Sequence, residues 1–534
     1  MSALFSNPEM LRNARIQLRP GRAIAAAIIC AAISLTIWYS FESHAEIRVG
    51  ASDAIEMFKF ILQMQVFVLL VGGGIYELLT VHREKELNTF DYQRVTRLTS
   101  MELAVGKLFG APILAYFIVL CLMPIAIAAA VLGHAPLGLV VEAYVILLVG
   151  CIAFHILALL ISTTLGRGVS AIAVLPYLVL VGFTSADFFT TQGPGLAPSA
   201  STWTVHQLNP FAANALFQID SLRGSVLSDL FFGVSVPHFA VLMVIYVTLI
   251  AWFLLAIVRN LKLDPAVYEL YSPMQAFGFA LYLNLLMLGF FNWKAPLGPP
   301  YIVNGQITGF ATFPARSVEA MLLAGSFWLF ALLGIVLLRN RERVRRRIQV
   351  LGERAAGFWA ALWPSPYLLA GVIVAGIAIV ELIRVYRNPA PGEWDWGLAT
   401  VSIAFYALWV ARDLLYLQWM SLRRTRRPLG SAMLYLLVFY TCTSVIFGVA
   451  HVLLRTSVAP YSAMLIPSGI SSLSIADWAA HYQIWLAALV VLAAEVLLFA
   501  FLQRQKLREF LVPAVVAPEP TPGHSHDAKI LSSS

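Results

Sequence analysis

Runs of about 20 apolar residues recur along almost the whole chain, and they constrain its fold more than any other feature of the sequence. A helix of that length crosses roughly 30 Å of hydrocarbon and satisfies its own backbone hydrogen bonds there. Hydrophobic residues make up 60% of the 534 residues and charged residues 12%, which excludes a soluble globular protein of ordinary composition. We therefore expect an all-α polytopic membrane protein with about twelve transmembrane helices.

The expected helices form two halves of six. We expect spans at 23–41, 57–81, 106–132, 137–163, 169–186, 236–258, 273–291, 317–338, 366–383, 397–417, 429–453 and 481–502. The sequence thus predicts a six-span unit over residues 1–262, a diverged second six-span unit over 263–511, and a disordered cytosolic tail over 512–534.

Lysine and arginine are concentrated in alternate loops, with the densest run at 339–347. Because cytosolic loops carry the excess of these residues, we expect both termini in the cytosol. The net charge of +8 is then explained by contacts with anionic membrane lipids, and no nucleic-acid partner is needed. The pattern is typical of a multi-pass protein of the plasma membrane, which in a bacterium is the inner membrane.

Dense mixed charge is held between two apolar segments at residues 82–107. Apolar residues recur there at steps of three to four, which predicts a helix over 82–105 lying flat at the membrane surface or against a partner. Thr99 and Glu102 form a capping-box pattern, so we expect a new helix to begin at that point. Lys107 ends the stretch, and we expect its side chain to reach lipid phosphate or a partner.

The same stretch resembles a known signature. Residues 84–89 (EKELNT) and 97–107 (RLTSMELAVGK) are similar to the E-x-E-x-G-T and P-x-S-x-x-E-x-x-x-G-K elements found between the second and third spans of ABC-2 type permeases. Asn88 stands where the family has glycine, and Arg97 stands where it has proline. Asparagine is among the residues that adopt a left-handed backbone, so the first change is mild, whereas the second removes a turn signal.

The resemblance covers residues 1–262 and implies the membrane subunit of an ATP-driven exporter, coupled to its ATPase through the helix at 82–105. The matching positions are Glu84, Glu86, Thr89, Arg97, Glu102 and Lys107. The phosphate-binding G-x-x-x-x-G-K-[ST] loop is missing from the sequence, so we expect ATP and Mg on a separate ATPase chain, with no cofactor and no catalysis here. Whether this chain pairs with itself or with a second permease stays open.

Four further residues are candidates for a transport pathway. Asn209 and Pro210 lie in the long segment 187–235, which resembles the region of ABC-2 permeases that dips into the membrane from outside, and we expect short re-entrant helices there. Glu495 and His155 lie inside predicted spans, where ionisable residues are functional candidates by default. Glu495 must be protonated, paired with an arginine or exposed to a wet cavity, and a hydrogen-bonded helix contact is the alternative role of His155.

Two other classes of protein stay open as alternatives. One is a secondary transporter driven by an ion gradient, with Glu495 as proton carrier. The other is a membrane-embedded glycosyltransferase that uses the acidic outer loop 42–56. The histidines at 524 and 526 have no further ligands near them in the sequence, so no metal site is expected. The transported substrate is not encoded in any motif.

Overall fold

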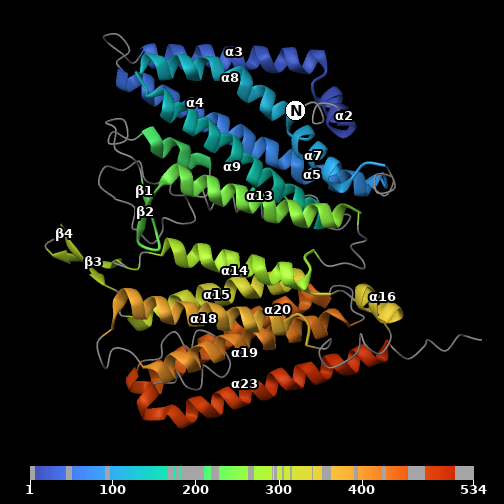
Figure 1. Cartoon of the computed structure of the whole chain (residues 1–534), viewed down its shortest axis with the longest axis vertical. Helices are drawn as coiled ribbons and strands as arrows, with labels where there is room; N and C mark the ends of the chain where they lie inside the picture. The colour runs from blue at the N-terminus through green and yellow to red at the C-terminus, as the bar shows by residue number, and fades with distance from the viewer. Residues whose placement is uncertain are drawn as a thin grey trace, which may run out of the picture. The chain divides into compact units, whose positions relative to one another are not determined.

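The computed structural model is predominantly helical over the residues that it describes (Figure 1). These are residues 7–43, 51–90, 97–164, 174, 177, 178, 181, 210–217, 228–262, 270–291, 293, 297–303, 306–312, 315–339, 341–351, 362–389, 395–423, 428–454 and 475–510. Contacts divide the chain into two units. The first unit contains residues 1–329 and 374–399, and the second unit contains residues 330–373 and 400–534.

The elements follow one another as long helices with two short hairpins. The helices before the first hairpin are α2 (Pro8–Gln17), α3 (Pro20–Ser43), α4 (Ala51–Phe67), the π-helix η1 (Val68–Gly73), α5 (Gly74–Glu86), α7 (Ser100–Gly110), α8 (Ile113–Leu132), α9 (Leu137–Thr164) and the 3-10 helix η2 (Pro210–Phe217). The later helices are α13 (His238–Lys262), α14 (Pro273–Phe290), α15 (Ala315–Leu337), α16 (Arg341–Leu351), α18 (Ser365–Arg387), α19 (Trp396–Ser421), α20 (Pro428–Leu454) and α23 (Ile475–Glu509). The strands are β1 (Ser228–Phe231), β2 (Val234–Pro237), β3 (Leu297–Val303) and β4 (Gln306–Thr312).

Most of the predicted spans are present as helices. Within the described residues, nine helical runs are long and apolar enough to cross a membrane: α3, the continuous α4–η1–α5 run, α8, α9, α13, α15, α18, α19 and α23. Shorter apolar helices at Met274–Phe290 and Ser431–Phe447 coincide with two more predicted spans, and the span predicted at 169–186 falls largely outside the described residues. The prediction of a multi-pass, α-helical membrane protein is confirmed.

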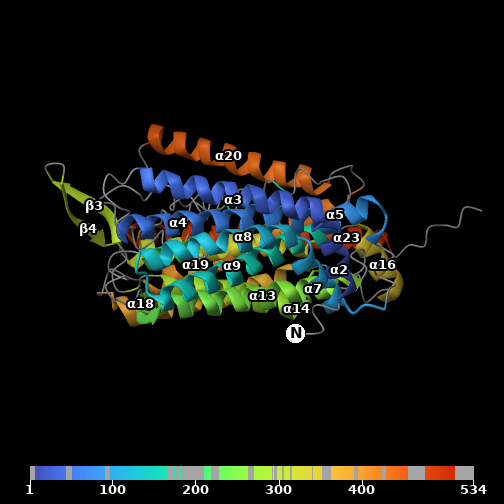
Figure 2. The ribbon, with the colours of Figure 1, turned by 90° about the horizontal axis from the view of Figure 1, so that it is seen from above.

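Helix α9 is the most deeply buried span of the first unit. It packs against α5, α13 and η2, and Figures 1 and 2 show α9 and α13 running alongside each other. Small residues make this close approach possible, as is usual between helices in membranes. A Cβ on Gly150 would lie 2.7 Å from Cγ of Pro210 and 3.1 Å from the Tyr246 ring. The predicted pathway residue Pro210 is therefore buried against α9.

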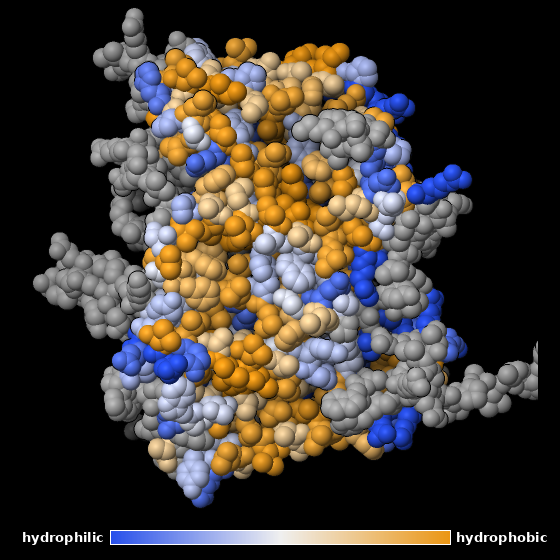
Figure 3. Space-filling view, viewed as in Figure 1, coloured by the Kyte–Doolittle hydropathy of each residue, from blue (hydrophilic) through white to orange (hydrophobic). Residues whose placement is uncertain are grey.

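The outer surface of the first unit is suited to lipid. Apolar side chains on α3 are well exposed, including Ile28 at 63% and Leu35 at 72%. Figure 3 shows apolar side chains over the middle of the helices of this unit, with hydrophilic side chains near the end where α2 and α5 lie. This apolar surface costs little when it faces hydrocarbon, because lipid chains replace water around it.

The segment predicted at 187–235 contains two small elements among its described residues. The helix η2 packs on α4 and α9, so a short helix is present where one was expected. The β1–β2 hairpin follows, and its turn residues Phe232 and Gly233 have φ of 47° and 74°. Two successive left-handed residues match the right-handed twist of a two-residue hairpin. The neighbouring Asn209 lies outside the described residues.

The second unit is built around α19. Trp409 of α19 and Trp485 of α23 are fully buried, and Phe405 packs edge-on against Trp485 at 6.1 Å between ring centroids. The basic helix α16 buries Val344 and Ile348 in a small apolar cluster with Leu422 and Leu507 while Arg345 is exposed. An apolar face opposite arginines is typical of a helix at a membrane surface.

Candidate functional site

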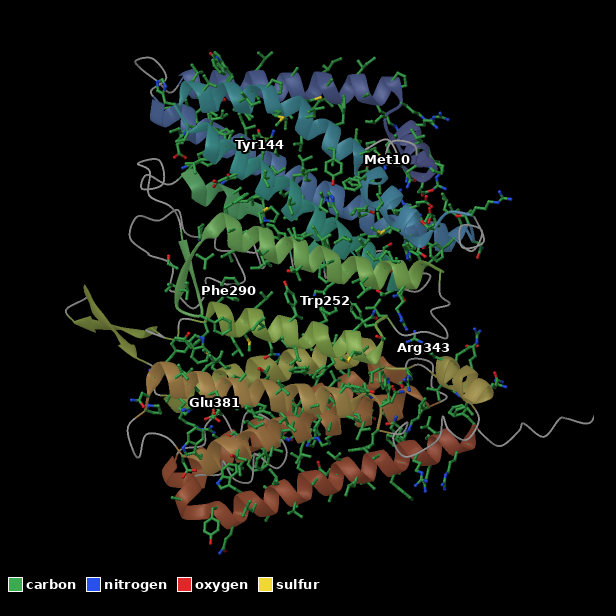
Figure 4. All side chains as sticks on the ribbon, in the orientation of Figure 1. Met10, Tyr144, Trp252, Phe290, Arg343 and Glu381 are labelled. Carbon is green, nitrogen blue, oxygen red and sulfur yellow. The ribbon has the colours of Figure 1, made fainter. Side chains whose placement is uncertain are left out.

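A cluster of four charged side chains joins α2, α5 and α7, and we call it the ion cluster. Lys107 of α7 is fully buried, and its Nζ lies 2.6 Å from Oε2 of Glu84 on α5 and 3.3 Å from Oε1 of Glu9 on α2. The Arg12 guanidinium of α2 bridges the same two carboxylates, at 2.7 Å from Glu9 and 3.0 Å from Glu84. Two cations and two anions thus neutralise one another. In Figure 4, Met10 marks the position of α2 beside α7.

Because Lys107 is buried, removing one of its partners from the ion cluster would destabilise the protein. Each buried ion costs several kcal/mol of hydration, which is recovered only through close, hydrogen-bonded partners of opposite charge. The expectation that Lys107 reaches lipid phosphate or a partner is therefore wrong: its ammonium is held inside the chain by Glu84 and Glu9. This lysine connects helices and is not a surface contact.

The end of α5 presents Glu84 to the cluster through a specific turn. Asn88 has φ of 57°, and its N–H donates to the Lys85 carbonyl at 3.3 Å, while the Thr89 N–H donates to the Glu84 carbonyl at 2.9 Å. These two bonds define a Schellman motif, in which the left-handed residue is usually glycine. Asn88 thus adopts the left-handed backbone that asparagine tolerates better than most residues.

The start of α7 is fixed by the predicted capping box. The Glu102 N–H donates to Oγ1 of Thr99 at 3.1 Å, and the Thr99 N–H donates to Oε2 of Glu102 at 2.8 Å. The carbonyl of Glu102 accepts a bond of 2.6 Å from Nδ2 of Asn7, whose Oδ1 caps the first turn of α2. Glu102 therefore orients α7 and α2, and its own carboxylate stays exposed.

Two glycines allow α2 to lie directly on α7. A Cβ on Gly106 would lie 2.5 Å from Oδ1 of Asn7 and 2.8 Å from Cβ of Glu9, and one on Gly110 would lie 3.2 Å from the Met10 backbone. Contacts below 3.0 Å cannot be accommodated without moving α2. The glycine of the Gly106-Lys107 pair thus provides the space into which Glu9 brings its carboxylate.

The other charged residues at the end of α5 have different partners. Lys85 donates to the carbonyls of Ser162 and Thr163 at 3.2 and 2.7 Å, where its charge complements the C-terminal end of α9. Glu86 accepts a hydrogen bond from Nε2 of His82 at 3.0 Å and is 45% exposed. The two glutamates of the signature therefore have opposite environments, because Glu84 is buried and Glu86 faces solvent.

The single flat helix predicted over 82–105 is not what the described residues form. Helix α5 ends at Glu86, the chain turns at Asn88, and α7 begins only after Thr99. Arg97 is exposed in the bend before α7, and residues 91–96 lie outside the described part. The helix ends for a local reason, because a left-handed residue stabilised by a Schellman motif terminates a helix.

His155 and Glu495, two of the predicted pathway residues, each have polar partners within their own unit. His155 is fully buried, with Nε2 2.8 Å from the Leu69 carbonyl and Nδ1 3.1 Å from the Tyr116 hydroxyl, so it makes the hydrogen-bonded helix contact considered as its alternative role. Glu495 belongs to the second unit and lies 3.3 Å from the guanidinium of Arg412. It therefore has the arginine partner that one interpretation of the sequence required.

Arg412 is the centre of a polar group within the spans of the second unit. Its guanidinium donates to Asp413 at 2.9 Å and to the Tyr440 hydroxyl at 2.9 Å, and Tyr440 also donates to Asp413. No sequence pattern associates Arg412 with Tyr440, which lies 28 residues later in the chain. Four groups that share their charges in this way are stable within apolar surroundings, which a lone arginine is not.

A π-helix interrupts the long α4–η1–α5 span, and nothing in the sequence analysis anticipated it. The Leu69 carbonyl is paired with His155, and the Leu70 carbonyl accepts a 2.6 Å bond from the Tyr177 hydroxyl. These side chains satisfy backbone groups within the interrupted helix. Three consecutive glycines, Gly72–Gly74, are the sequence feature that marks this interruption. Glycine is needed at position 74 because a Cβ there would lie 2.0 Å from the Tyr177 hydroxyl.

Comparison of the chain with protein-family models, with curated proteins and with solved structures finds no match. Among the described residues, no group of three or more His, Cys, Asp or Glu side chains is placed to hold a metal ion. The fold defines the class, a multi-pass α-helical membrane protein, and the ion cluster joins three helices within the described part of the chain.

Proposed function

We propose that this chain is the membrane-spanning permease subunit of an ATP-driven ABC exporter, and that a separate ATPase subunit hydrolyses ATP. One observation supports this most directly: both parts of the signature, residues 84–89 and 97–107, contribute to one site through the buried Glu84–Lys107 pair. Residues of a shared motif that meet in space have a common structural task. The proposal includes about twelve spans in two halves and cytosolic termini, as expected from hydropathy and charge.

The exposed side of this site fits a contact with an ATPase. Leu87 is 72% exposed and Met101 is 46% exposed, beside the solvent-facing Glu86 and Arg97. Apolar residues surrounded by charges at a polar surface are typical of a protein interface. The contact is presented by the turn after α5 and by the first turn of α7, so it is smaller than the predicted helix over 82–105.

The ion cluster supplies the rigidity that coupling needs. A force applied near Glu86 acts on α5, which continues through η1 and α4 as one span of 34 residues. Lys107 and Arg12 tie the end of that span to α7 and α2, so the three helices move together. Movement of packed elements as units is the usual way in which a local push becomes a larger rearrangement.

The test is purification of the tagged chain from its native host in a mild detergent or in native lipid patches, followed by identification of bound subunits and an ATPase assay. We expect an ATPase with a phosphate-binding loop in stoichiometric amount. Leu87→Glu should release it without changing the thermal stability of the permease, whereas Glu342→Ala, an exposed glutamate on α16, should retain it. A stable wild-type chain that carries no ATPase in either medium would refute the proposal.

A further inference from the structure

Glu77 on α5 is a buried carboxyl group that the proposed function does not use. Its side chain has no exposed surface, and neither Oε1 nor Oε2 has a hydrogen-bond partner among the described residues. Glu319, another buried glutamate, differs because Arg316 binds it at 2.7 Å. A buried carboxylate without a partner is strongly disfavoured in such a site, so Glu77 requires a ligand.

Lys107, the cation that acts on Glu77, is already shared by other carboxylates. Glu77 and Glu84 are seven residues apart, which places them on the same face of α5 about two turns from each other. Lys107 attracts the charged form of Glu77 and Glu84 repels it, but the Lys107 ammonium makes its hydrogen bonds with Glu84 and Glu9. The charges within the ion cluster therefore balance one another, and Glu77 is left without a counter-ion of its own.

The surroundings of Glu77 hold few free polar atoms. A helical side chain leans over the turn before its own Cα, which here contains Gly73 and Gly74. His155 and Tyr177 press against these glycines, and both use their polar atoms on the Leu69 and Leu70 carbonyls of η1. The described residues thus offer Glu77 neither a cation of its own nor a ring of oxygen atoms.

These surroundings discriminate between possible ligands. A Ca²⁺ or Mg²⁺ ion requires about six oxygen ligands, and no cluster of metal-binding side chains occurs among the described residues. A proton requires only one carboxylate oxygen, and it removes the charge that burial disfavours. The titratable groups that face Glu77 come from its own helix and from its neighbours: Glu84 on α5, Lys107 on α7, Tyr116 on α8, and Tyr177, with His155 and Cys151 of α9 beyond Tyr116.

We propose that Glu77 is a proton-binding site inside the first unit, occupied at neutral pH, and that its proton controls how firmly Lys107 is held by Glu84. While the proton is bound, Glu77 is neutral and Lys107 belongs to the ion cluster. When the proton leaves to water, the new carboxylate competes with Glu84 for the same ammonium. Protonation of Glu77 is thereby linked to the contact that joins α5 and α7. This link does not depend on the proposed ATPase partner.

Infrared spectroscopy of the purified chain at neutral pH tests this directly, because the C=O stretch of a neutral carboxyl group is separate from the bands of a carboxylate. Wild type minus Glu77→Gln should show the loss of one neutral carboxyl band. Glu77→Asp keeps the carboxyl group and should shift that band, and it serves as the test if the glutamine variant does not fold. Glu495→Gln is the matched control, since this glutamate pairs with Arg412 and should remove only carboxylate bands.

A second readout concerns Lys107. As pH is raised, the neutral carboxyl band of the wild type should disappear, and hydrogen exchange at the start of α7 should accelerate over the same pH range. In Glu77→Gln that acceleration should be absent. Loss of a carboxylate band in Glu77→Gln and a shifted carboxylate band in Glu77→Asp, with the neutral band unchanged in both, would overturn the proposal. Exchange at α7 that is insensitive to Glu77 would overturn its link to the ion cluster.

Discussion

Replacing Lys107 by methionine removes the central charge of the ion cluster with little change in side-chain length. Glu84 and Glu9 then remain buried, and Arg12 alone faces them. Breaking a buried ion pair from one side destabilises proteins by about 3–5 kcal/mol. Arg12 is 48% exposed and therefore screened by water, so it offsets only part of that loss. We expect Lys107→Met to lower the free energy of unfolding by about 3 kcal/mol or more.

Denaturant titration of the protein in detergent, followed by tryptophan fluorescence and by size-exclusion profiles, measures this change. Lys59→Met is the matched control, because Lys59 pairs with the exposed Glu56 and surface pairs contribute about 0–1 kcal/mol. Glu84→Gln combined with Lys107→Met completes a double-mutant cycle, and we expect the double variant to be less destabilised than the sum of the single variants. If Lys107→Met is as stable as Lys59→Met, the ion cluster does not hold α2, α5 and α7 together.

Substitutions of Asn88, Gly106 and Tyr177 test separate parts of the structure. Asn88→Val should cost about 1–2 kcal/mol because a β-branched residue resists a left-handed backbone, while Asn88→Gly should be neutral or stabilising, as thermal unfolding can show. Gly106→Leu should displace α2 and expose the amino-terminal residues to limited proteolysis, and an unchanged digestion pattern would contradict the close packing. Tyr177→Phe should cost about 1–3 kcal/mol because it leaves the Leu70 carbonyl unsatisfied. Tyr246→Phe is its control, since the buried Tyr246 hydroxyl has no partner among the described residues and its removal should not destabilise the fold.

The spans could be predicted from the sequence because each depends only on a local property. An apolar run of about 20 residues needs no knowledge of its neighbours to be recognised as a helix in hydrocarbon. The capping box at Thr99 and the left-handed Asn88 were equally local, and both are present. The flat helix over 82–105 failed for a related reason, because the three- to four-residue spacing of apolar residues continued across a turn that interrupts the helix at Asn88.

The partners of Lys107 could not be predicted, because they depend on tertiary contact. Glu9 is 98 residues away in the sequence, and no local pattern connects the two residues. The same holds for Arg412 and Glu495, which lie 83 residues apart on different helices. The one sequence signal for such contacts was Gly106, because a glycine inside a helix marks a place where another chain segment comes close.

The opposite environments of Glu84 and Glu86 determine how any coupling experiment on this protein must be interpreted. Glu84 and Glu86 are two residues apart on a helix, which corresponds to a rotation of about 200° around its axis. Their side chains therefore point to nearly opposite sides and cannot face the same partner. Glu84→Ala removes a carboxylate from Lys107 and Arg12, and loss of a bound ATPase in that variant would follow from a loosened α5 even if Glu84 never touched the ATPase. Glu86 and Leu87 are not part of the ion cluster, and their side chains are 45% and 72% exposed, respectively. Only variants of these exposed residues, made in a chain whose stability is unchanged, separate a lost contact from a lost fold.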